Sequence, residues 1–204
     1  MRDSQADAPR SLYPLPGTIA PLDAVRGTIL ALDWRALREA EVFDAYQAAI
    51  EAGARDALLG STAGSWVPMT LIHAHYRALD ALDLDEERIR RIGWSVGDGA
   101  HGAFLQTLIR LAGALGVTPW LALEQCHKLW IRTWRGGAIA VHRLSPHDAR
   151  VSLVKVGVCG SRFFRHSFGG ALCAGIAPFC RTRSAQVIGG SVGQHGVAFR
   201  VSWV

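Results

Sequence analysis

Three glycines, Gly97, Gly99 and Gly102, have the spacing of a dinucleotide-binding fingerprint. That fingerprint works when a strand precedes the glycines and a helix follows them, so that a pyrophosphate meets the helix N-terminus. Here the preceding residues 86–94 carry apolar side chains at helical spacing instead. We therefore expect these glycines to kink or divide a helix, and not to bind a nucleotide.

A second stretch, Gly189-x-Ser191-x-Gly193, has the letters of a hydrolase nucleophile elbow. The elbow requires a helix after the serine, and an acid and a histidine later in the chain. Here a strand pattern follows, no acid lies beyond Asp148, and His195 is too close. We expect a hairpin at this point. Neither motif has the flanking strands and helices that its chemistry requires. We therefore predict no catalytic residues and a protein that is not an enzyme.

A pair of histidines, His73 and His75, would provide two metal ligands on one side of a strand. Residues 68–82 have helical spacing, however, and positions two apart on a helix point in different directions. No acid or third histidine stands at helical ligand spacing beside them. We expect one surface histidine, one semi-buried histidine and no metal site.

Two other histidines, His101 and His127, lie in or beside apolar helical segments. Trp94 and Phe104 flank the first, and Trp130 is near the second. A histidine in an aromatic pocket can hydrogen-bond a ligand or ligate a haem iron, whereas an ordinary core or surface histidine is the alternative. We predict a ligand pocket near Trp94, His101, Phe104 and His127.

The charge is unevenly distributed along the 204 residues. Residues 1–100 carry a net charge of −5 and residues 101–204 a net charge of +10. A positive end favours anionic partners, unless the acidic half or a partner subunit offsets it. No nucleic-acid motif accompanies the arginines that could cradle phosphates, so we expect a solvated rim made of Arg132, Arg135, Arg162, Arg165, Arg181 and Arg183.

Composition places the chain among globular proteins, with 50% hydrophobic and 19% charged residues. We expect residues 1–24 to be a flexible leader, without the pattern of a signal peptide. The longest apolar run, residues 168–179, is too short and glycine-rich to span a bilayer. The four cysteines form no CxxC pair, which favours reduced, packed thiols and no zinc site. These features predict a cytoplasmic protein.

The order of the expected elements predicts an α+β fold. Helices are expected first, within residues 34–134, and a strand–strand–helix–strand–strand unit follows in residues 136–204. The expected helices are 34–59, one opened by Trp66-Val-Pro68, one from 85 that breaks at the glycines, 104–115 and 118–134. The expected later elements are strands 138–144 and 150–158, helix 161–179, and strands 185–191 and 197–204.

We expect residues 25–204 to form one domain with a four-stranded antiparallel sheet. The late helix should lie on one face of this sheet through a small-residue face of Gly170, Cys173, Ala174 and Ala177. The N-terminal helices should form a layer packed on the same unit. Such layered arrangements commonly leave an apolar pocket between helices and sheet.

The chain also resembles known families. Five stretches carry the first resemblance: Arg26–Ile29, Trp66–Pro68, Arg91–Gly93, Leu129–Arg132 and Phe199–Trp203. In these stretches the chain resembles an uncharacterised paralogous family that is expanded in myxobacteria. More distantly, the terminal unit is similar to the fold shared by vinyl-reductase-type ligand-binding domains, haem nitric-oxide-binding sensors and TRAPP trafficking subunits. That resemblance implies a pocket with a small apolar ligand, and frequent dimerisation.

The functional residues of those relatives carry over poorly. The haem sensors have a Tyr-x-Ser-x-Arg motif before the late helix, where this chain has Val158-Cys-Gly-Ser-Arg162, without the tyrosine or the spacing. The phenol sensors hold zinc with cysteines and a glutamate around the final hairpin, and residues 186–201 contain neither. We therefore expect no cofactor, with haem on His127 as the open alternative.

Together these observations predict a non-enzymatic module that binds a small molecule or acts in signalling, with an apolar pocket between helices and sheet. We expect a small apolar ligand and a homodimer or a protein partner. The alternative is a scaffold that docks an acidic partner through its basic C-terminal half, without a small ligand.

Overall fold

The computed structural model describes residues 11–13, 15, 17–112, 118–193 and 195–204, with side chains described for residues 15, 17–100, 118–193 and 195–204. It contains seven α-helices, one 3-10 turn (η1, Ala177–Phe179) and two antiparallel sheets within those ranges. The α+β class and the helices-first order are confirmed. Within the described residues, every helix is too short or too polar to cross a membrane.

The larger sheet contains the four predicted strands and one more. Its order is β1 (Ser11–Tyr13), β5 (Ala138–Ser145), β6 (Asp148–Val154), β8 (Gly196–Trp203) and β7 (Arg183–Val187). All neighbours are antiparallel. Strand β1 lies inside the expected leader, so at these three residues the chain pairs with the sheet edge instead of remaining free.

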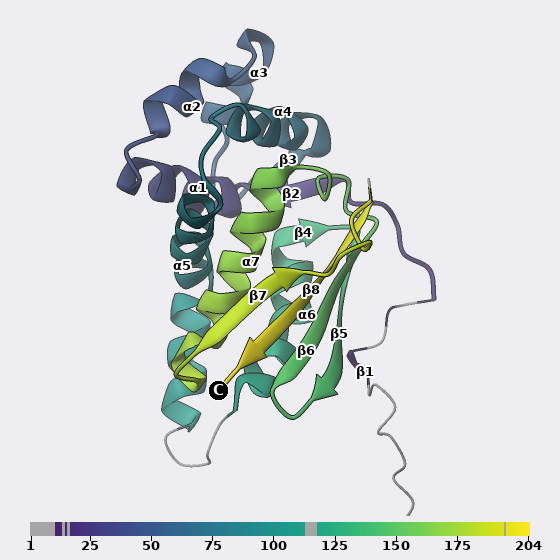
Figure 1. Cartoon of the computed structure of the whole chain (residues 1–204). Coiled ribbons are helices and arrows are strands. Elements are labelled where there is room, and N and C mark those ends of the chain that lie inside the picture. The colour runs from purple at the N-terminus through teal and green to yellow at the C-terminus, as the bar shows by residue number, and fades with distance from the viewer. Residues whose placement is uncertain (1–10, 14, 16, 113–117, 194) are drawn as a thin grey trace, which may run out of the picture.

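Strand β6 lies at the centre of the sheet, and burial alternates along its side chains. Ala149, Val151 and Leu153 are buried, while Arg150 between them is exposed. Val151 pairs with Val141 on one side and Phe199 on the other, so one face of the sheet is continuous and apolar. This face receives the helices (Figure 1).

The first helical region differs from the prediction. Instead of one helix over 34–59, the chain forms α1 (Gly27–Glu39), α2 (Phe43–Ala49) and α3 (Ala52–Leu59). The break after α1 occurs at Glu41, whose φ of 57° belongs to the left-handed region that ends helices. Apolar periodicity continues through these breaks, which is why the pattern suggested a single helix.

A small second sheet was not predicted. Its order is β3 (Trp66–Pro68), β2 (Ala24–Arg26) and β4 (Trp134–Arg135), all antiparallel. Trp66, Val67 and Pro68 form strand β3, and helix α4 (Met69–Asp80) begins only after them. The prediction that these three residues open a helix was therefore wrong. Strands of two or three residues carry no periodicity that sequence analysis can detect.

Helix α5 (Glu86–Ala112) is continuous through the glycines that were expected to break it, and it includes residues 104–112 of the expected helix 104–115, whose last three residues lie outside the described residues. The glycines allow close contact with α7 (Arg162–Ile176). A Cβ atom on Gly93 would lie 1.9 Å from the Ser167 carbonyl oxygen, and one on Gly170 would lie 2.2 Å from the Arg90 carbonyl oxygen. Gly170 therefore faces α5, and not the sheet as predicted; Gly169 is the glycine directed toward Ala185 of the sheet.

Helices α6 (Pro119–Thr133) and α7 cover the apolar face of the sheet (Figure 1). Trp120 packs edge-on against Trp203 at 4.7 Å between ring centroids, and Phe168 of α7 lies 5.5 Å from Phe199. Helix α5 packs on the far side of α7. The core between these helices and the sheet is the place where a ligand would have to fit.

Candidate functional site

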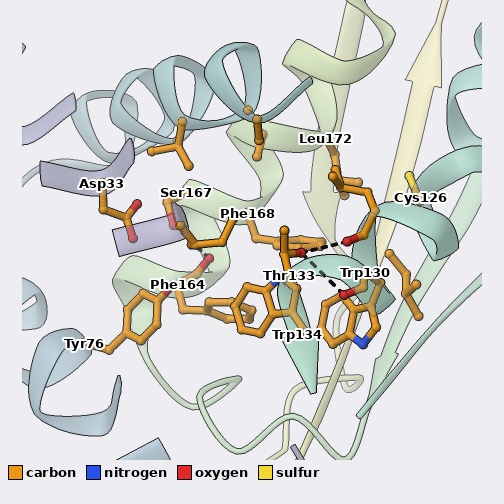
Figure 2. A pocket seen from close by; sticks show the side chains of 18 residues that line it. Asp33, Tyr76, Cys126, Trp130, Thr133, Trp134, Phe164, Ser167, Phe168 and Leu172 are labelled. Carbon is orange, nitrogen blue, oxygen red and sulfur yellow. Dashed lines mark hydrogen bonds between the residues drawn. The ribbon is translucent and has the colours of Figure 1, made fainter. Parts of the chain in front are cut away.

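An apolar cavity of about 100 Å³ lies among α1, α5, α6, α7 and β5 (Figure 2). Every one of these elements supplies an aliphatic or aromatic side chain to its wall, as does α4. The aliphatic and phenylalanine part of the wall includes Ile29, Val96, Leu129, Ile139, Phe168 and Leu172. The predicted pocket between helices and sheet is therefore present.

Aromatic rings form one continuous side of the cavity. Trp130 and Trp134 stack with centroids 4.9 Å apart and an interplanar angle of 9°. Phe164 stands edge-on to Trp134 at 6.1 Å and to Tyr76 at 5.4 Å. The Trp130 indole donates a hydrogen bond to the Gly136 carbonyl oxygen at 3.2 Å, which fixes the ring.

A carboxyl group and a phenol hydroxyl lie on one side of the cavity. Figure 2 shows Asp33 of α1 and Tyr76 of α4 on one side of it, with Cys126 on the other. Asp33 is 6% exposed. Its carboxylate lies 3.3 Å from Nε2 of His75, whose Nδ1 lies 2.7 Å from the hydroxyl of Tyr46.

Burial sets the protonation of the groups at the cavity. It raises the pKa of the Tyr76 hydroxyl well above its usual value, and the negative charge of Asp33 raises that pKa further. The hydroxyl therefore stays protonated and is able to donate a hydrogen bond. Burial likewise raises the pKa of the Cys126 thiol to about 12, so this group is not a nucleophile at neutral pH.

Of the four residues predicted to lie at the pocket, two have described side chains, and both lie outside the cavity lining. Trp94 lies outside the cavity, in an open groove of about 530 Å³ where the Arg183 guanidinium stands 4.5 Å from the centroid of its ring. His127 is half-buried on α6 and does not line the cavity, and burial lowers its pKa. The side chains of His101 and Phe104 lie outside the described residues, so their assignment stays a prediction.

Sequence reasoning missed the residues that give this cavity its character. Asp33, Tyr76 and the aromatic wall come from five separate elements, and no sequence spacing relates them. One signal was available, because Asp33 interrupts the apolar stretch Ile-Leu-Ala-Leu-Asp-Trp that becomes α1. A carboxylate on the buried side of a helix is rare without a specific role.

His75 is also more deeply placed than predicted. It is fully buried in the interior and hydrogen-bonded on both ring nitrogens, whereas a semi-buried or surface position was expected. His73, two residues before it, is half-buried. In the part of the chain that the structure describes, no three His, Cys, Asp or Glu side chains are grouped as they would be around a metal ion. The four cysteines are unpaired, and Cys159 is fully buried.

The chain is similar to known proteins in its fold and not in its sequence. No protein-family model matches the chain, and no curated protein matches it significantly in sequence. Among solved structures, an oxygen-binding H-NOX domain related to soluble guanylate cyclases aligns with a TM-score of 0.55 at 12% identity, covering 87% of this chain and 94% of that domain. The chain shares the H-NOX fold.

Two further H-NOX structures agree. An iron(II) unliganded variant from K. algicida gives a TM-score of 0.56 at 12% identity, covering 88% of this chain and 96% of that one. A variant from T. tengcongensis gives 0.54 at 11% identity, covering 87% and 97%. The resemblance to haem nitric-oxide-binding sensors is thus confirmed as a likeness of fold, while the resemblance to a myxobacterial family stays a prediction.

The residues described here do not fit a haem. The cavity of about 100 Å³ is smaller than the ~300–1,000 Å³ typical of sites for drug-sized ligands, and a porphyrin is larger still. No histidine stands among the described lining residues as an axial ligand. At the position of the haem-sensor motif, Ser161 caps α7 by accepting a hydrogen bond from the Phe164 amide, and the Arg162 guanidinium donates to the Leu84 carbonyl oxygen.

Proposed function

We propose that this protein is a non-enzymatic sensor-type domain that binds a small, mostly apolar molecule in the cavity beneath α5, α6 and α7. The observation that carries the proposal is the cavity itself, which has an apolar wall and few polar groups, as ligand sites do. The shared H-NOX fold supports it, since the structures with that fold include haem-containing and oxygen-binding domains.

The proposed ligand is not haem. A volume of about 100 Å³ is below the ~150 Å³ of a cavity that accepts benzene, which favours a molecule of a few non-hydrogen atoms. Titration with haemin should accordingly give no saturable Soret band. A stoichiometric band that His127→Ala or His101→Ala abolishes would show instead that haem is the ligand.

Ligand binding is tested by NMR titration with dissolved propane, followed on the indole N–H signals of Trp130 and Trp134. We expect saturable shifts of both signals, because their rings form the cavity wall. Leu129→Trp, which fills the cavity, should abolish the shifts. Ile131→Trp on the same helix should leave them unchanged, since Ile131 is 57% exposed and outside the lining. Equal shifts in both variants would contradict the proposal.

The groove around Trp94 supports a second candidate function, the docking of an acidic partner. Four of the residues that line it are arginines, and they are Arg90, Arg91, Arg181 and Arg183. Arginine forks match carboxylate and phosphate geometry. Binding of a polyglutamate peptide that weakens steeply with salt, and that Arg183→Gln weakens further, would support this role; salt-independent binding would contradict it.

A further inference from the structure

The cavity contains a buried carboxylate that lacks a cationic partner among the described residues. Asp33 has an ion-pair geometry only with His75, and no Lys or Arg of the described chain lies within salt-bridge distance. Within the same part of the chain, its second carboxylate oxygen accepts no side-chain hydrogen bond. Asp33 lines the cavity, so its carboxyl group stands at the wall that a ligand would meet.

The hydrogen bonds around His75 assign a role to each of its ring nitrogens. The Trp34 indole is a donor only, and it lies 3.4 Å from the Tyr46 hydroxyl oxygen, which must accept. Tyr46 is fully buried, and the acceptor available to its own proton is His75 Nδ1 at 2.7 Å. The imidazole proton then sits on Nε2 and is donated to Asp33. Asp33 is thus bonded to one imidazole N–H and, within the described residues, to no Lys or Arg side chain.

The aromatic wall is suited to the missing positive charge. Trp130, Trp134, Phe164 and Tyr76 line the same cavity as Asp33, and their ring faces attract cations. Aromatic rings around an ammonium group, with a carboxylate at one end, combine cation–π attraction with a charge-assisted hydrogen bond. The remaining lining is aliphatic and suits small alkyl substituents.

We propose that the ligand of this cavity is a small protonated alkylamine, with its ammonium group between the Asp33 carboxylate and the Tyr76 ring and its alkyl carbons against Trp130, Trp134 and Phe164. This inference rests on the proposed function and specifies the class of molecule that the cavity takes. About 100 Å³ accommodates roughly three or four non-hydrogen atoms, at ~30 Å³ for each water-sized group. The Tyr76 hydroxyl offers a second hydrogen-bond partner to the same nitrogen.

The test compares isopropylammonium with 2-propanol, which has the same shape and no charge. Both are titrated into the full chain and followed on the Trp130 and Trp134 indole signals. We expect the amine to bind at least about tenfold more tightly than the alcohol, because a desolvated cation–π contact and an ion pair act together. Asp33→Asn keeps the shape and removes the charge, so it should reduce this preference to less than about twofold. Asp44→Asn removes an exposed carboxylate of α2 that is outside the lining, so it should leave the preference unchanged.

The outcomes separate this inference from the proposed function. If propane and 2-propanol bind and the amine has no advantage in the unmodified protein, the cavity is a ligand site but not an amine site. That comparison requires no variant, so it stands even if Asp33→Asn fails to fold. If none of the three molecules shifts the indole signals, the proposed function fails as well.

Discussion

At the scale of single residues, the buried chain Trp34–Tyr46–His75–Asp33 is the least ordinary feature of the molecule. It runs through α1, α2 and α4 and ends at the cavity. Buried polar groups are stabilising when each is hydrogen-bonded and costly when one partner is removed. The network therefore ties three helices to the ligand site and makes their packing sensitive to its integrity.

The Tyr46 hydroxyl is predicted to contribute to stability. Tyr46→Phe leaves His75 Nδ1 and the Trp34 indole without their partner, so we expect the free energy of unfolding to fall by about 1–3 kcal/mol. Tyr76→Phe is the matched control, because the Tyr76 hydroxyl makes no hydrogen bond within the described residues and its loss should matter less. Urea denaturation of both variants measures this. A larger loss in Tyr76→Phe would show that the buried network is not a stabilising unit.

A second residue-scale prediction concerns acid. The Arg200 guanidinium and the Ser202 and Ser145 hydroxyls donate to Asp148 and hold its pKa well below the usual 3.8. Since the folded protein binds this proton less readily than the unfolded chain, the contribution is present above pH 4 and is lost as pH falls below the ordinary value. Asp148→Asn should cost about 1–3 kcal/mol at pH 7.

The measurement is the free energy of unfolding of both proteins between pH 7 and pH 2. The difference between wild type and Asp148→Asn should shrink below about pH 4, as the carboxyl of the unfolded wild-type chain becomes protonated while that of the folded protein stays ionised. A difference that stays constant down to pH 2 would mean that the charge of Asp148 is not what stabilises the β5–β6 turn.

At the scale of elements, the contact between α5 and α7 is the feature that the sequence pattern concealed. Glycine disfavours a helix interior by about 1 kcal/mol, so a run of glycines suggests a break. The backbone contact between Gly93 and Ser167 and between Gly170 and Arg90 offsets this cost, but it is a tertiary effect. Strand β6, by contrast, was predictable, because the alternation of its side chains is local information.

Gly170 is predicted to be irreplaceable at this contact. In Gly170→Ala the added methyl group would meet the Arg90 backbone, so α5 and α7 must separate, and we expect a loss of about 2–4 kcal/mol. Gly53→Ala is the matched control. Gly53 lies in α3 with nothing within 4 Å of a Cβ atom, so alanine there should stabilise by up to about 1 kcal/mol. Thermal unfolding measures both, and an unchanged melting temperature in Gly170→Ala would contradict the close packing.

At the scale of the whole molecule, helices from both halves of the chain and strands β4 and β5 line a small cavity. The architecture and the presence of a pocket followed from the order of elements in the sequence. The residues that line the pocket did not, because they come from seven elements and meet only after folding. Trp94, a predicted lining residue, packs instead against Arg183 in the groove lined by α5, α7 and β7.

The central claim, that this cavity is a ligand site, is tested most directly by the structure of crystals pressurised with xenon. Apolar cavities of this kind bind xenon. We predict a xenon atom among Leu129, Phe168 and Leu172, present in Ile131→Trp and absent in Leu129→Trp. If xenon occupies other sites in the same crystals and leaves this cavity empty in the wild type, the cavity is closed to ligands and the account is wrong.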